Sequence, residues 1–180
     1  MTQQVAFLRA INVGGHVVKM EDLRRLFEAA GFDGVQTYIQ SGQVIFETPV
    51  GHVAELEREI EAHLQQALGY RVATFLRSLP ELGAISRYAP FPGSEAEENS
   101  TLYVAFLRDE PGASPQRQLL SLGDDIHSFH VHQREVFWLR RRFPGEPPFS
   151  SAFLEKTLQA EATLRNMTTI RKIVAKYDVT

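Results

Sequence analysis

The segment Val5-Ala6-Phe7-Leu8-Arg9 decides the fold of this chain, because the same five residues return as Val104-Ala105-Phe106-Leu107-Arg108. Each copy is a short and almost continuously apolar run, which is the pattern of a strand buried on both faces of a sheet. An identical strand half a chain away indicates a tandem duplication. We therefore expect two copies of one sheet-and-helix unit within the 180 residues.

The first half predicts one such unit from apolar periodicity and turn residues. The expected elements are a strand over 5–9, a helix from about 19 to 30, strands over 35–40 and 43–48, a helix over 52–68 and a strand over 71–77. This β-α-β-β-α-β order is typical of the ferredoxin-like fold, an α+β architecture. Ser78 and Glu81 predict a capping box that opens a further short helix. The glutamates between Glu55 and Glu61 predict the solvated face of the second helix.

The second half predicts a similar but less complete unit. The expected elements are strands over 101–108, 126–132 and 135–140, a helix beginning at Ser114-Pro115, a helix from about 149 and a last helix over 166–177. A final strand is not evident, so the pattern predicts βαββα with an extra C-terminal helix. We expect units over 1–90 and 101–180, joined by a linker over 91–100 that is rich in Pro, Gly and acidic residues.

The composition favours a soluble cytoplasmic protein. The chain has no Cys, which excludes disulfides and thiolate metal sites and fits a reducing compartment. No apolar run is long enough to span a membrane, and the N-terminus lacks the pattern of a signal peptide. A formal net charge of −3 gives no general attraction to nucleic acid. The sequence leaves the oligomeric state open.

The loop after the first strand carries the first candidate ligand-binding residues, Asn12, Gly14, Gly15 and Lys19. Glycines let backbone N–H groups turn toward a ligand, and the lysine would add a cation for an anionic group. The loop matches neither a Walker motif nor a dinucleotide fingerprint, so the sequence predicts no cofactor. The alternative is a structural turn in which Asn12 hydrogen-bonds the chain.

Two further clusters complete the candidate site. Tyr38, Gln40 and Ser41 lie at the end of the predicted hairpin and could bond a ligand, or else serve a turn that needs Gly42. Arg165 and Asn166 lie before the last helix. Arginine can bind a carboxylate or phosphate with two parallel hydrogen bonds, whereas the alternative is a helix cap that ties this helix to the first half.

Three histidines and a basic run are further candidate sites in the second half. Strand alternation would put His130 and His132 on one face and His127 on the other, which favours a solvated strand over a metal site. The run Arg140-Arg141-Arg142 beside Trp138 could bind RNA on a ferredoxin-like sheet, but a solvated turn explains it as well.

Three segments resemble the motifs of a known family, the domain-of-unknown-function family 1697. They are Leu8–Gly15, Thr37–Gln43 and Ala162–Asn166, which follow the family's order over almost the whole chain. Two positions differ, since the family usually has Asn at Gln43 and an aromatic residue at Met167. The resemblance implies duplicated ferredoxin-like units in cytoplasmic bacterial proteins, and it implies no reaction.

The function that we expect is non-catalytic binding of a small anionic ligand in a cleft between the two units, where the three candidate clusters would converge. One alternative is an enzyme that acts on a phosphorylated or carboxylated metabolite, with Lys19 and Arg165 as binding cations and His16 near the first motif. The other alternative is an RNA-binding module, which would need exposed aromatic rings on a sheet.

Overall fold

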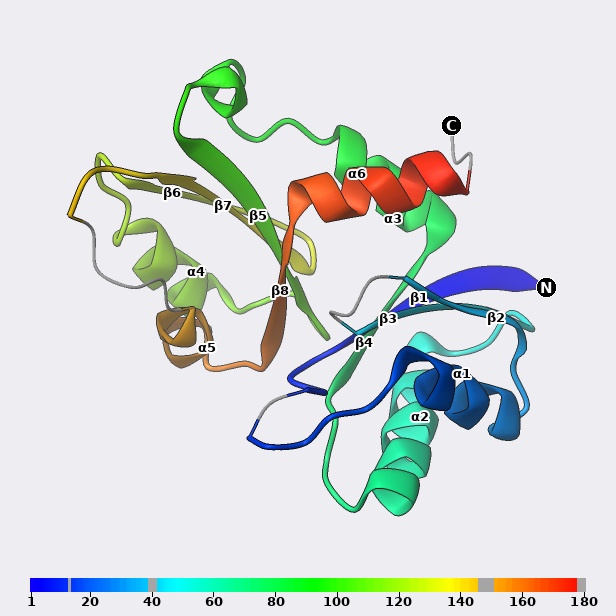
Figure 1. Cartoon of the computed structure of the whole chain (residues 1–180). Coiled ribbons are helices and arrows are strands. Elements are labelled where there is room, and N and C mark those ends of the chain that lie inside the picture. The colour runs from blue at the N-terminus through cyan, green and yellow to red at the C-terminus, as the bar shows by residue number, and fades with distance from the viewer. Residues whose placement is uncertain (13, 39–41, 146–150, 178–180) are drawn as a thin grey trace. The chain divides into compact units, whose positions relative to one another are not determined.

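The computed structural model describes residues 1–12, 14–38, 42–145 and 151–177 (Figure 1). It is an α+β structure whose described residues form two four-stranded antiparallel sheets and six α-helices. The chain divides into unit 1, which comprises Met1–Gly83 and Tyr177–Thr180, and unit 2, which comprises Ala84–Lys176. None of the described helices is both long and apolar enough to cross a membrane.

Unit 1 contains the first sheet, with strand order β2-β3-β1-β4. Its strands are β1 (Thr2–Leu8), β2 (Asp33–Tyr38), β3 (Gln43–Thr48) and β4 (Thr74–Ser78), and its helices are α1 (Met20–Ala29) and α2 (Val53–Leu68). Both helices cover the same face of the sheet (Figure 1). Their apolar stripes meet Ala6, Leu8 and Phe46 of the sheet in one buried core. The predicted order of the first half is confirmed.

Unit 2 contains the second sheet, with strand order β6-β7-β5-β8. Its strands are β5 (Ser100–Leu107), β6 (His127–His132), β7 (Glu135–Arg141) and β8 (Ala162–Asn166), and its helices are α4 (Ala113–Leu120), α5 (Ala152–Leu158) and α6 (Met167–Lys176). Helix α3 (Leu79–Arg87) follows β4 and a 3₁₀ turn over Ser94–Ala96 precedes β5. Trp138, Leu119 and Leu154 pack into the core under α4 and α5.

Strand β8 corrects the prediction that the second half lacks its final strand. Ala162 to Asn166 pairs with β5 from Leu107 to Tyr103, so this segment completes a second βαββαβ order. The segment contains Thr163, Arg165 and Asn166, whose polarity makes it look like a helix start rather than a strand. Each sheet is also followed directly by a helix, so the helix after β8 is part of the repeat and not an addition.

The duplication extends to the register of the strands. Val5 pairs with Ile45 and Arg77, and the matching Val104 pairs with Phe137 and Arg165. At the end of each first strand, the N–H of Leu8 donates to the carbonyl of Gly42 at 2.8 Å, and that of Leu107 donates to the carbonyl of Arg134 at 2.9 Å. The two sheets can therefore be compared position by position.

Two helix starts were predicted from capping residues, and one of them is wrong. The capping box at α3 is confirmed, since the N–H of Ser78 donates to Glu81 Oε2 at 2.7 Å and the N–H of Glu81 donates to Ser78 Oγ at 3.3 Å. Helix α4 begins at Ala113 with Gly112 as its N-cap, two positions before Ser114, the predicted N-cap. The predicted start of the next helix at 149 and 150 lies outside the described residues, and α5 begins at Ala152.

The acidic face of α2 is also corrected. Glu55 and Glu59 are exposed, but Glu57 is 1% exposed and its Oε1 accepts the N–H of Leu76 at 2.9 Å. One turn later, Glu61 Oε1 accepts the N–H of Thr74 at 2.9 Å. These two carboxylates bond the outer side of β4, which is an edge strand of its sheet.

Candidate functional site

The β1–α1 loop of unit 1 is held by contacts at both of its ends. Asn12 Oδ1 accepts the N–H of Val18 at 2.7 Å, which folds the loop back on itself and matches the structural role considered for Asn12. Gly14 and Gly15 have φ angles of +65° and +83°, and an added Cβ would meet nothing within 4 Å at either position. Their backbone conformation, rather than a lack of space, is what favours glycine there.

Tyr70, which lies between α2 and β4, contacts the β1–α1 loop at two points. Its hydroxyl donates to the carbonyl of Ile11 at 2.9 Å, and its ring stacks on His16 with centroids 4.0 Å apart. Burial raises the pKa of the Tyr70 hydroxyl, which keeps it a neutral donor. The loop thus has a fixed path from Ile11 to Val18, apart from Val13, which lies outside the described residues.

The β2–β3 hairpin meets this loop at one end of the sheet. An added Cβ on Gly42, whose φ is +79°, would lie 2.9 Å from Ile11 Cγ2 and 3.3 Å from the carbonyl oxygen of Leu8. The positive φ that was predicted for Gly42 is confirmed. Gln40 and Ser41 lie outside the described residues, and Tyr38 ends β2 beside them. Gly42 therefore lies against the start of the β1–α1 loop, at the same end of unit 1.

A hollow opens beside the loop at the start of α1. Its volume is about 390 Å³, and its walls come from Asn12, Val17, Val18, Lys19 and Met20. Val17 is 82% exposed, so the hollow presents apolar surface next to the ammonium of Lys19. Ligand pockets typically combine apolar walls with a few polar groups in this way, at volumes from about 300 Å³.

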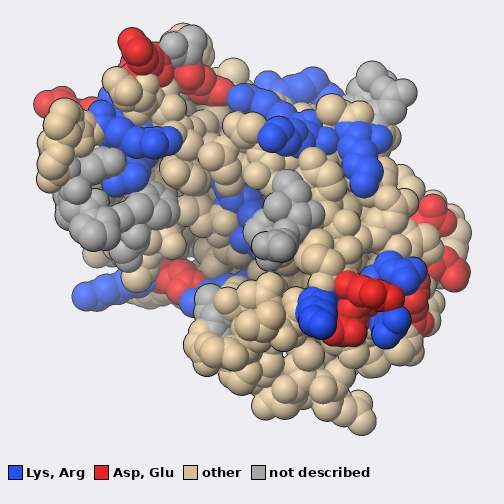
Figure 2. All heavy atoms as spheres, viewed as in Figure 1, with Lys and Arg blue, Asp and Glu red and all other residues tan. Residues whose placement is uncertain are grey.

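Helix α1 carries ion pairs between residues one turn apart, and one of them involves Glu21 of its first turn. Glu21 Oε1 lies 2.6 Å from Arg25 Nη2, and Glu28 Oε1 lies 2.9 Å from Arg24 Nη1, each pair one turn apart. Figure 2 shows neighbouring red and blue side chains over this helix. Glu21 and Asp22 in the first turn of α1 would oppose an anion there, and the pairing of Glu21 with Arg25 weakens the share of Glu21 in that opposition.

The third candidate cluster lies in unit 2, on β8. Arg165 Nη1 donates to Thr163 Oγ1 at 2.7 Å and to the carbonyl of Leu164 at 2.9 Å. Burial lowers the pKa of the Arg165 guanidinium to about 10. Asn166 Oδ1 accepts the N–H of Thr168 at 2.8 Å, so the capping role considered for Asn166 is present. The convergence of Arg165 and Asn166 with the residues of unit 1 stays a prediction.

Arg77 is a charged residue that sequence reasoning missed. It lies on β4 with 1% exposure, and its Nη1 donates to the carbonyl of Leu76 at 2.7 Å. The pairing of Arg77 with Val5 makes it the counterpart of Arg165, which pairs with Val104. The repeated pentapeptide aligns only β1 with β5, and it is the pairing of β4 and β8 with those strands that brings the two arginines to the same position.

The comparisons with known proteins agree with this architecture. A family model described as a protein of unknown function, DUF1697, matches residues 1–137. The chain belongs to the DUF1697 family. A solved structure, that of the conserved bacterial protein SP0830 from Streptococcus pneumoniae, is similar to this chain with a TM-score of 0.71. The alignment covers 99% of each chain at 23% sequence identity, which supports the fold alone. The search of curated proteins gave no match.

The three histidines in β6 of this DUF1697 chain have protein partners in unit 2. His130 Nε2 and the hydroxyl of Tyr88 share a hydrogen bond of 2.8 Å, and His132 stacks on the Tyr88 ring with centroids 4.3 Å apart. On the other face, His127 Nδ1 accepts the indole N–H of Trp138 at 3.1 Å. The predicted alternation of faces is confirmed. Burial, with a smaller effect of the nearby His132, lowers the pKa of His130.

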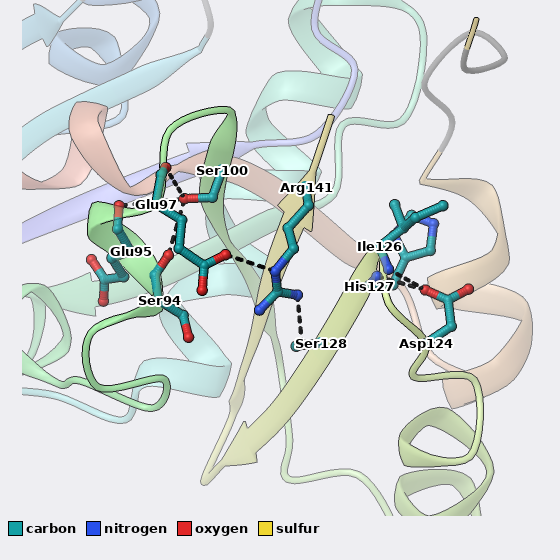
Figure 3. Close-up of polar contacts among 9 residues, drawn as sticks. All are labelled: Ser94, Glu95, Glu97, Ser100, Asp124, Ile126, His127, Ser128 and Arg141. Atoms are coloured by element: carbon teal, nitrogen blue, oxygen red, sulfur yellow. Dashed lines mark hydrogen bonds and ion pairs between the residues drawn. The ribbon is translucent and has the colours of Figure 1, made fainter. Parts of the chain in front are cut away.

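The basic run of the DUF1697 chain is tied to its own unit (Figure 3). Arg141 Nε donates to Glu97 Oε2 at 2.9 Å and its Nη1 donates to Ser128 Oγ at 3.1 Å. Nearby, Asp124 Oδ1 accepts the N–H groups of His127 and Ile126, and chiefly the bond from His127 lowers the pKa of the Asp124 carboxyl. These contacts order the start of β6 and the end of β7.

Proposed function

We propose that this DUF1697 protein is a non-catalytic binding protein whose ligand is a small anion, and that the ligand enters the hollow beside the β1–α1 loop. The observation that carries the proposal is the hollow of about 390 Å³ with Lys19 and Asn12 on its walls. Its loop is fixed by Tyr70 and by the bond between Asn12 and Val18, so little ordering entropy would oppose binding.

The two alternatives have less support. An enzyme would need an acid or base at the reacting atoms, and among the described residues that line the hollow only Lys19 has an ionisable side chain. An RNA-binding sheet would need exposed aromatic rings, whereas Phe7, Phe75, Phe106 and Phe137 are all 0% exposed. A small anion is therefore the ligand class that we favour.

The test is a thermal-shift titration of the full chain with phosphate, sulfate and acetate at constant ionic strength. Lys19→Gln is compared with the wild type and with Lys172→Gln, which removes an exposed lysine from α6. A hydrogen bond to a charged group contributes about 1.5–3 kcal/mol, so we expect Lys19→Gln to bind roughly tenfold or more weakly. Equal shifts in all three proteins would refute the proposal.

We also propose that both units are ferredoxin-like and that the protein is cytoplasmic. The βαββαβ order and the strand order 2-3-1-4 support ferredoxin-like units over 1–90 and 101–180, joined by 91–100. The absence of Cys from the sequence supports a cytoplasmic location.

A further inference from the structure

The walls of the hollow in unit 1 are more apolar than a site for an inorganic anion requires. Of the five described residues that line it, three are apolar, namely Val17, Val18 and Met20. Val17 is 82% exposed, and Val18 and Met20 are partly exposed, so water covers apolar surface there. A ligand that removes this surface from water gains free energy in proportion to the apolar area that it covers.

The size of the hollow also exceeds what an inorganic anion needs. Its volume is about 390 Å³, whereas one water molecule takes about 30 Å³ of the liquid. A phosphate or acetate ion is only a few times larger than a water molecule, so either ion would leave most of the hollow to solvent. The hollow therefore has room for an aliphatic group beside a charged one.

The charges around the hollow favour a ligand with one negative charge. Lys19 is the one charged residue among the described residues of the walls. Glu21 and Asp22 in the first turn of α1 oppose an anion, and the ion pair with Arg25 offsets only the share of Glu21. The cost of removing an ion from water grows with the square of its charge, whereas its attraction to one cation grows only in proportion. A monoanion is therefore favoured over a dianion.

We propose that the ligand of this hollow is a monocarboxylate with a short aliphatic chain. Its carboxylate lies at the ammonium of Lys19, and its chain lies against Val17, Val18 and Met20. This inference rests on the proposed function, because it names the chemical class of the anion for the same site. The bond of 2.7 Å from the N–H of Val18 to Asn12 Oδ1 holds the apolar wall in place before a ligand enters.

The test is a titration of the full, isotope-labelled chain with acetate, butyrate and hexanoate, followed by the NMR shifts of its amides at constant ionic strength. A fully buried CH₂ group strengthens binding about fourfold. Because the hollow is open to solvent, we expect about a threefold gain for each step of two CH₂ groups. The amides of residues 17–20 should shift with all three ligands.

Two further ligands test the charge of the site at mildly alkaline pH, where phosphate is mainly a dianion. Butylammonium has the chain of butyrate with the opposite charge, and we expect it to bind at least about tenfold more weakly. Hydrogen phosphate should also bind more weakly than butyrate, because it covers no apolar wall and carries two charges.

Three variants assign the roles of the walls. Val17→Ser changes an exposed side chain, so the fold should stay intact, and it should reduce the gain from acetate to hexanoate by about twofold while acetate binds as before. Val50→Ser is the matched control, because Val50 is 88% exposed and lies outside the hollow. It should keep the wild-type gain. Lys19→Gln should weaken the binding of all three carboxylates.

The outcomes separate this inference from the proposed function. Equal affinities for the three carboxylates, tighter binding of phosphate than of butyrate, or an unchanged gain in Val17→Ser would each overturn the monocarboxylate and leave anion binding in place. Equal binding of butyrate and butylammonium, or no shift of the amides of residues 17–20 with any anion, would overturn both proposals.

Discussion

His130 and Gln36 occupy the same position in the two sheets. In unit 2, His130 pairs with Phe137, which pairs with Val104. In unit 1, Gln36 pairs with Ile45, which pairs with Val5. Each bonds a tyrosine hydroxyl that follows a helix. The hydroxyl of Tyr177 donates to Gln36 Oε1 at 2.7 Å, as Tyr88 bonds His130 at 2.8 Å. The partner of the tyrosine hydroxyl is therefore a histidine, which can gain a proton, in unit 2 and a glutamine, which cannot, in unit 1.

Replacing His130 by the glutamine of its counterpart should remove a pH dependence of stability. Burial holds the pKa of His130 below its ordinary value of about 6.5, so the unfolded chain binds the proton more readily than the folded chain. Stability is then retained above pH 6.5 and is lost as the pH falls below it. We expect His130→Gln to lose less stability than the wild type between pH 7.5 and 5 in urea denaturation.

The control for this variant is His52→Gln, which changes an exposed histidine before α2. That variant should follow the wild-type pH profile. A His130→Gln profile that also follows the wild type would show that the half-buried His130 does not set the acid sensitivity.

Single residues were predictable where a local rule acts on them. Gly42 needs a positive φ, and Ser78 with Glu81 forms a capping box. Arg77 was not predictable in isolation, because nothing local marks a charged residue in a strand as buried. Its burial depends on packing from residues that are distant in sequence.

At the scale of elements, the edge strands β4 and β8 have the same protection. Glu57 and Glu61 of α2 accept N–H groups from β4, and Glu155 of α5 accepts the N–H of Ala162 in β8 at 3.0 Å. Unpaired N–H groups on an edge strand invite pairing with another chain. Carboxylates from the neighbouring helix occupy those groups in both units.

Removing the buried carboxylate of Glu57 should therefore destabilise the protein. Glu57→Leu leaves the N–H of Leu76 without this acceptor, and an unsatisfied buried donor costs about 1–3 kcal/mol. The expected result is a lower free energy of unfolding in urea and faster hydrogen exchange of the Leu76 amide. Glu57→Gln keeps an acceptor oxygen and should retain most of the stability.

Glu59→Leu is the matched control, because Glu59 is exposed on the same helix. It should change the free energy of unfolding by less than about 0.5 kcal/mol. Equal losses for Glu57→Leu and Glu59→Leu would argue against the protection of the β4 edge.

Most elements were predictable because their apolar residues follow the period of a helix or strand. Strand β3 and the end of α2 lie where the pattern places them. Strand β8 escaped prediction since three of its five residues are Thr163, Arg165 and Asn166. Only its pairing with β5 identifies it as a strand, and that pairing is a long-range property.

At the scale of the whole molecule, unit 1 is built from two separate parts of the chain. Tyr177 belongs to it, although the helix before that residue belongs to unit 2. Tyr177 and Gln36 are 141 residues apart in sequence. The apolar periodicity of the sequence predicts the two repeated units, but it does not predict that Tyr177 belongs to unit 1. Nothing in the sequence around Tyr177 or Gln36 identifies the other as its partner.

Tyr177→Phe should destabilise unit 1 by about 1 kcal/mol, the usual contribution of one hydrogen bond. The measurement is urea denaturation, with hydrogen exchange of the β2 amides as the local readout. A double-mutant cycle with Gln36→Leu is the control, since the double variant should cost less than the sum of the single ones. Strict additivity would mean that the two side chains do not interact in solution.

The remote position of Tyr177 also bears on how the protein is made. A ribosome that has just added Gln36 to the chain must add 141 further residues before Tyr177, whose hydroxyl bonds Gln36, is present. During translation the nascent β2 edge is thus without this bond until Tyr177 has left the exit tunnel.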